Sequence, residues 1–106
     1  MIRLLFLFSL FVFTSCNWNE LPEVVCVPDE QVFLDLVQPI LENNCISCHS
    51  TIANRPAVLE TYDGVIDALT NYSLKEKVIN HAMPPYGSPA LIDSDIMIIQ
   101  KWADCE

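Results

Sequence analysis

Apolar positions recur at helical spacing in the part of the chain that follows residue 28. The first such stretch begins at Asp29, and its apolar residues stand three and four positions apart: Val32, Phe33, Leu36, Val37, Ile40 and Leu41. This spacing places them on one face of an amphipathic helix. Pro39 interrupts the stretch and predicts either a kink or a second short helix that starts at the proline.

Three further helices are expected nearer the C-terminus. Thr61 is expected to cap a short helix with apolar residues at 65, 66 and 69, despite Gly64. The run Ser73-Leu74-Lys75-Glu76 has the pattern of a capping box and predicts a helix that ends at about His81. The last helix is expected from Asp93 to about Asp104, with Asp93 or Ser94 as its cap and Ile96, Ile99, Trp102 and Ala103 as apolar positions.

Loops separate these helices, and no strand pattern appears. Ser50 to Pro56 is expected to be a loop, and a cluster of helix breakers forbids regular structure later in the chain: Pro84, Pro85, Gly87 and Pro89. No convincing alternation of apolar and polar residues predicts a strand. The predicted fold class is all-α.

The first fifteen residues have the pattern of an export signal. Arg3 precedes an apolar run from Leu4 to Phe13, which is too short to span a bilayer but suits a secretory signal. Phe13-Thr14-Ser15-Cys16 resembles the lipobox of bacterial lipoproteins, in which the cysteine is lipidated, although Phe13 stands where an aliphatic residue is usual. The alternative is an ordinary signal cut near Ser15, which leaves Cys16 as a free thiol. We expect a signal peptide at 1–15, a lipidated tether at 16–28 and one domain at 29–106.

Charge and size narrow the class of protein. The 106-residue chain has a net charge of −9, and loss of the signal removes Arg3. Phosphate backbones attract basic proteins, so this charge argues against nucleic-acid binding. A domain this small struggles to build enough core without a disulfide, a metal or a cofactor, and the chain has five cysteines.

The segment Cys45-Ile46-Ser47-Cys48-His49 carries the expected chemistry. C-x-x-C-H is the attachment pattern of c-type haem: two thiols three positions apart reach the two vinyl groups of one porphyrin, and the adjacent imidazole is directed at the iron. A thiol redox motif would need a βαβ context, and structural zinc would need a second ligand pair of similar spacing. We therefore expect one covalently bound haem c per chain, with His49 as the proximal iron ligand.

The sixth iron position has two candidate ligands. Met83 lies in His81-Ala82-Met83-Pro84-Pro85, where the prolines could hold a loop against the distal face. Thioether ligation raises the haem potential and suits electron transfer. His81 is the competitor, although a histidine at a helix end is often a partner for terminal carbonyls. If neither binds, the open iron would suit a ligand-binding or sensory haem domain.

Residues 29–104 resemble a small single-haem class I cytochrome c, in the lipoprotein-anchored bacterial form. Val37-Gln38-Pro39-Ile40-Leu41 before the attachment site is similar to the N-terminal helix of that family, and Leu59 to Val65 to the segment along the haem edge. Met83-Pro84-Pro85 resembles the axial-methionine loop, and Ile96 to Trp102 the C-terminal helix that crosses the N-terminal one. Two departures are Ala82, where glycine is common, and the start of the last helix, which has Ile92 and Asp95 in place of Ser or Thr and Glu.

The resemblance implies a one-electron carrier, not an enzyme. It implies Cys45 and Cys48 as haem attachment sites, His49 and Met83 as axial ligands, and the cytochrome c maturation machinery as a partner. Because the two terminal helices cross in this family, it also implies a disulfide between Cys26 and Cys105; the alternative is two unpaired thiols. The expected location is the cell envelope, facing the periplasm or the exterior, with redox proteins of unknown identity as partners. A haem-free lipoprotein with two disulfides is a more distant alternative.

Four further side chains have a functional and a plainer interpretation. Arg55 could pair with a haem propionate, since guanidinium matches carboxylate geometry, or it could be a solvated loop residue. Tyr62, Tyr86 and Trp102 could contact the haem, although aromatic residues at such positions are more often core.

Overall fold

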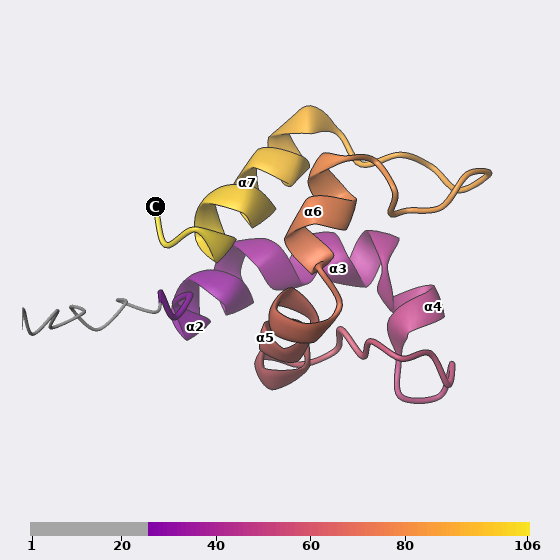
Figure 1. The fold of residues 1–106 in the computed structure, drawn as a ribbon, viewed down its shortest axis with the longest axis horizontal. Coiled ribbons are helices and arrows are strands. Elements are labelled where there is room, and N and C mark those ends of the chain that lie inside the picture. Colours follow the sequence, from indigo (N-terminus) through magenta and orange to yellow (C-terminus); the bar gives the residue numbers. More distant parts are fainter. Residues whose placement is uncertain (1–25) are drawn as a thin grey trace, which may run out of the picture.

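The computed structural model describes residues 26–106, which form helices joined by loops (Figure 1). Three helical segments run on from one another: α2 (Glu30–Val32), η1 (Phe33–Val37) and α3 (Gln38–Asn44). They are followed by α4 (Ile46–His49), α5 (Tyr62–Asn71), α6 (Leu74–Ile79) and α7 (Asp93–Ala103). These residues contain no strand, which agrees with the predicted all-α class. The predicted signal peptide, Cys16 and most of the predicted tether lie outside the described residues.

Pro39 accounts for a change of winding in the first helix. In the π turn η1, the N–H of Gln38 donates to the carbonyl of Phe33, five residues earlier. Proline lacks an N–H, and its ring crowds the carbonyl four positions before it, which here belongs to Asp35. The wider turn falls where a regular winding would meet this conflict. The helix therefore continues as α3, with the proline in its first turn.

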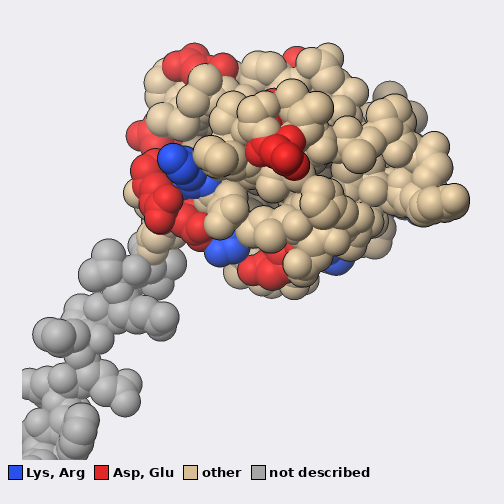
Figure 2. Space-filling view, turned by 90° about the horizontal axis from the view of Figure 1, so that it is seen from above, with Lys and Arg blue, Asp and Glu red and all other residues tan. Residues whose placement is uncertain are grey.

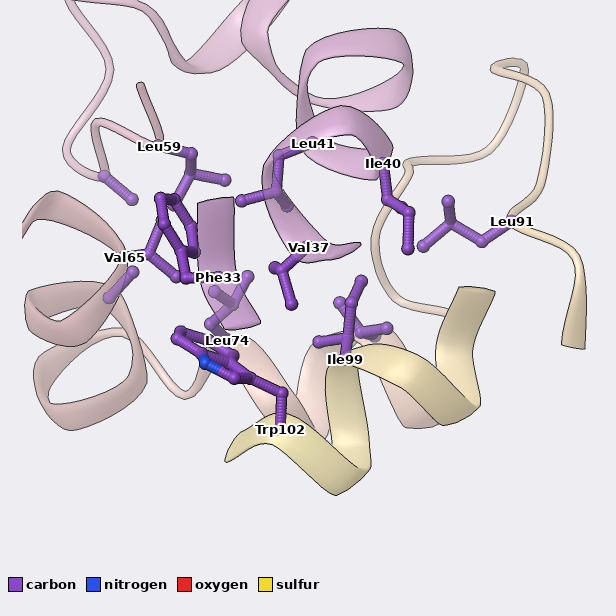
Figure 3. Packing of buried hydrophobic residues seen from close by; sticks show 13 residues of the cluster. Phe33, Val37, Ile40, Leu41, Leu59, Val65, Leu74, Leu91, Ile99 and Trp102 are labelled. Atoms are coloured by element: carbon purple, nitrogen blue, oxygen red, sulfur yellow. The ribbon is translucent and has the colours of Figure 1, made fainter. Parts of the chain in front are cut away.

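One hydrophobic core joins the first helix to α5, α6 and α7 (Figure 3). Phe33, Val37, Ile40 and Leu41 are buried from the first helix, and Ile99 and Trp102 from α7. The sequence pattern placed Val32 and Leu36 on the same face, but they are 38% and 51% exposed. Each stands one position before a buried residue, about 100° around the helix. The packing of η1 against α7 covers only the narrower stripe.

Helix caps agree with the sequence pattern at one of three expected places. The Thr61 hydroxyl accepts from the N–H of Gly64 at 3.1 Å, and a Cβ at Gly64 would collide with the carbonyl oxygen of Val58. The prediction of a capping box at Ser73 is wrong, because the backbone of Ser73 is left-handed (φ 52°) and its hydroxyl makes no capping hydrogen bond. A capping side chain needs extended backbone. The last helix begins at Asp93 with Ile92 as its cap, so neither Asp93 nor Ser94 caps it.

The two ends of the described chain are held together. Cys26 and Cys105 form a disulfide with their Cα atoms 6.1 Å apart. Next to it, the Tyr62 hydroxyl donates to the carbonyl of Pro28 at 2.6 Å, and Trp102 Nε1 donates to the carbonyl of Asp29 at 2.8 Å. Both rings also pack against Phe33, with centroids 5.7 and 5.5 Å from it. Tyr62 and Trp102 are therefore structural residues of this end.

Replacement of both Cys26 and Cys105 by serine is expected to lower the free energy of unfolding by about 4–5 kcal/mol. The disulfide joins residues 79 positions apart, so it removes much conformational entropy from the unfolded chain. Denaturant unfolding of the wild type and of the double variant measures the difference. A loss below about 1 kcal/mol would contradict this account from the entropy of the unfolded chain.

His81 ends α6 in a Schellman motif. Its N–H donates to the carbonyl of Val78 at 3.2 Å, and the N–H of Ala82 donates to the carbonyl of Lys77 at 2.8 Å. This pair of bonds requires a left-handed residue between them, and His81 has φ 57°. Glycine is the usual residue at that position because other residues are strained there. His81 is exposed, so the structure gives it the place of a helix-end residue.

His81→Gly is expected to raise the free energy of unfolding by about 1 kcal/mol, because glycine adopts the left-handed backbone without steric cost. Asn80→Gly is the matched control. Asn80 has φ −84°, so glycine there brings only its entropic cost and should be neutral or destabilising. The denaturant midpoints of the two variants, compared with that of the wild type, measure these effects. Equal changes at both positions would refute the explanation that His81 strains the backbone.

Candidate functional site

A cavity of about 530 Å³ lies between α4, the loop that follows it, α5, α6 and the loop between α6 and α7. This volume is within the range of pockets that hold organic cofactors. The residues that line it are mostly apolar: Asn44, Cys45, Ser47, Cys48, His49, Arg55, Pro56, Ala57, Leu59, Ala68, Tyr72, Leu74, Lys77, Met83, Pro84, Pro85, Ser88 and Leu91. In Figure 1, α4 and the loop between α6 and α7 lie at one end of the molecule, and α2 and the C-terminus lie at the other.

The short helix α4 brings the three residues of the C-x-x-C-H motif to the cavity. The N–H groups of Cys48 and His49 both donate to the carbonyl of Cys45, at 3.1 and 2.9 Å. This winding places residues three and four positions apart on one side of a helix. Cys45, Cys48 and His49 all line the cavity, and neither cysteine is in a disulfide.

The ring of His49 is oriented by a backbone carbonyl. Its Nδ1 lies 2.8 Å from the carbonyl oxygen of Ala57, and a carbonyl can only accept, so Nδ1 carries the proton. The N–H of Leu59 donates to the carbonyl of His49 at 2.8 Å and ties the same two segments together. The lone pair of a neutral His49 is therefore on Nε2. A hydrogen bond from the other ring nitrogen is the usual way in which proteins orient a histidine that binds a metal.

The thiol of Cys45 does not resemble that of a redox cysteine. Burial, with a smaller contribution from the neighbouring Cys48 thiol, raises the pKa of Cys45 to about 11. Cysteines that exchange disulfides have lowered pKa values, because the thiolate is the nucleophile. The environment thus disfavours the thiol-exchange alternative for this motif.

Met83 reaches the cavity from the loop that follows α6. The N–H groups of Ala82 and Met83 both donate to the carbonyl of Lys77, at 2.8 and 3.1 Å, so the end of α6 fixes the start of this loop. The competing candidate, His81, is exposed and does not line the cavity. Met97, the other methionine of the described residues, lies on α7 and is also outside the cavity.

Charge is distributed unevenly around the site. Arg55 and Lys77 line the cavity, and no residue that lines it is Asp or Glu, although the chain has 14 acidic residues. On the face in Figure 2, acidic side chains gather towards the end from which the grey segment leaves, and the opposite tip shows no charged side chain.

Tyr86 lies fully exposed on the loop between α6 and α7 and does not line the cavity.

The structural zinc alternative can be compared with the described residues. Among residues 26–106 no group of three or more His, Cys, Asp and Glu side chains could hold a metal, which gives no support to a structural zinc site. In the same part of the chain, no helix is long and apolar enough to cross a membrane.

Sequence reasoning missed two contributors to the site. The carbonyl of Ala57 is a backbone group, and residue identity carries no signal for it. Lys77 falls within the predicted helix that begins after Ser73, and its place on the cavity depends on how α6 packs. Comparison with family models, curated proteins and solved structures finds no match to this chain.

Proposed function

We propose that this chain is a c-type cytochrome with the class I cytochrome c fold, which binds one haem and carries single electrons. The observation that carries the proposal is the hydrogen bond between His49 Nδ1 and the Ala57 carbonyl, in a cavity that Cys45 and Cys48 also line. The bond leaves Nε2 free to bind a metal, beside two thiols at the spacing of haem attachment.

The residues present fit a haem in size, polarity and donor set. Cys45 and Cys48 would hold the group through thioethers, and His49 and Met83 would be the axial ligands. When bound, the haem supplies the electron chemistry, and the protein supplies ligation and exclusion of water. The apolar wall excludes water through residues from several elements, among them Leu59, Ala68, Leu74 and Leu91. No acid or base is required, so we propose an electron-transfer protein rather than an enzyme.

The test of this function is a visible spectrum of the protein produced with a cytochrome c maturation system. One haem per chain, with the pyridine haemochrome of a porphyrin that has lost both vinyl groups, is the expected result. A colourless protein of unmodified mass would refute the proposal.

We also propose that Cys16 is lipidated and holds the domain at the cell envelope, where redox proteins are its partners. Cys26, the first described residue, lies at the end of the molecule away from α4 (Figure 1). An anchor joined there would attach the domain by the end opposite α4.

Cys16→Ala is expected to move the protein from the membrane fraction to the soluble fraction, because an apolar run of signal length cannot anchor a cleaved protein. Fractionation followed by immunoblotting measures this. An uncleaved signal could also retain the variant, so the wild type must incorporate a labelled fatty acid. A wild type that takes up no label would contradict lipidation.

A further inference from the structure

Two cations on the cavity lack a partner of opposite charge in the described structure. Residues 26–106 contain one ion pair, in which Lys75 Nζ lies 2.6 Å from an Asp104 carboxylate oxygen. Arg55 and Lys77 are in no such pair, and both line the cavity. They come from separate segments, the loop after α4 and the last turn of α6.

The surroundings of these cations are unusual for so acidic a chain. From Asn43 to Leu59, Arg55 is the only residue with a fixed charge, and from Val78 to Ile92 there is none. Carboxylates would be the ordinary neighbours of a lysine or arginine in a protein of net charge −9. Their absence from the cavity means that a negatively charged ligand would meet attraction there and no opposing carboxylate.

We infer that Arg55 and Lys77 bind the two propionate carboxylates of the haem and thereby raise its reduction potential. The inference rests on the proposed function. Ferric haem carries one more positive charge than ferrous haem, so a nearby cation favours the ferrous state. Guanidinium and ammonium groups both bind carboxylates, guanidinium with two parallel hydrogen bonds.

Lys77 connects the haem propionates to the loop that holds Met83. Its carbonyl accepts the N–H groups of Ala82 and Met83, while its side chain lines the cavity. Lys77 therefore holds the loop of Met83 with its backbone carbonyl and a haem propionate with its side chain. A competing explanation is that Lys77 only complements the C-terminal end of α6, as cations in a last helical turn do. That role would affect stability and leave the haem potential unchanged.

The test compares holoproteins with Arg55→Gln, Lys77→Gln, both changes, and the control Lys101→Gln. Lys101 is also an exposed lysine in a last helical turn, that of α7, and does not line the cavity. Each protein is poised at the potential that leaves the wild-type haem half reduced. We expect the ratio of ferrous to ferric haem to fall severalfold in each single cavity variant and further in the double variant. The control should stay at the wild-type ratio.

The outcomes separate this inference from the proposed function. A wild type without haem would refute the function itself. Variants that carry a full haem and keep the wild-type ratio would refute the inference and leave the function standing. If Lys77→Gln does not mature, Lys77→Arg is tested in its place. Normal maturation of Lys77→Arg with the wild-type ratio of ferrous to ferric haem supports a role for the charge. If neither Lys77→Gln nor Lys77→Arg matures, residue 77 acts through folding, and the inference is overturned.

Discussion

Replacement of both Cys45 and Cys48 by alanine is expected to abolish covalent haem binding. The wild type, produced with the maturation machinery, should gain the mass of one haem, which acid–acetone extraction cannot remove. The double variant should have the mass of the bare chain and release any colour on extraction. Both thiols line one cavity, Cys48 from α4 and Cys45 from the cap of that helix, and no other free cysteine is present in residues 26–106. Mass spectrometry and the haemochrome spectrum measure the result.

The chain offers a matched control in its other cysteine pair. Changing Cys26 and Cys105 to alanine removes the same number of sulfur atoms, from a disulfide at the opposite end of the molecule. That variant should keep its covalent haem, although it will be less stable. Extraction of all colour from the wild type would end the cytochrome interpretation, and equal loss of haem from both pairs would show an effect of folding.

Met83→Ala is expected to open the iron. The oxidised wild type should show the weak near-red band of methionine–haem coordination, and the variant should lose it. Its potential should fall by on the order of 0.1 V or more, a fraction of the roughly 0.8 V that axial ligands span. The direction follows because a thioether favours ferrous iron more than water or imidazole does. Cyanide and carbon monoxide should bind to the variant and not to the wild type.

Two controls test the choice of methionine. Met97→Ala removes the other methionine of the described chain, on the exposed side of α7, and should leave the band unchanged. His81→Ala should also leave it unchanged, because His81 holds the left-handed position of the helix end and does not line the cavity. If His81→Ala opened the iron, the sixth ligand would be histidine and the expected potential would be lower. Ready binding of carbon monoxide by the wild type would favour the sensory alternative.

The local pattern of the sequence was enough for most helices and for the residues of the motif. Periodicity predicted the first and last helices because burial of one face imposes a spacing of three and four residues. The motif places Cys45, Cys48 and His49 within one turn, so their grouping needs no distant part of the chain. The choice of Met83 over His81 followed from local sequence too, and Met83 is the one that lines the cavity.

Details of winding and caps depended on contacts that the pattern does not contain. Val32 and Leu36 are as apolar as their neighbours, and the packing of the other elements around the first helix leaves them exposed. Ser73 has the right residue type for a cap, but its left-handed backbone prevents the capping bond. Propensity describes one residue in an average setting, and tertiary packing overrides it.

The composition of the site beyond its motif was decided by the tertiary structure. The Ala57 carbonyl orients His49 across eight residues, the Lys77 carbonyl holds Met83, and Cys26 meets Cys105 across 79. Backbone carbonyls are identical at every position, so no residue type indicates which one will accept a particular bond. Contacts between distant segments form only where helix packing brings those segments together, and that packing also placed Arg55 and Lys77 on one cavity.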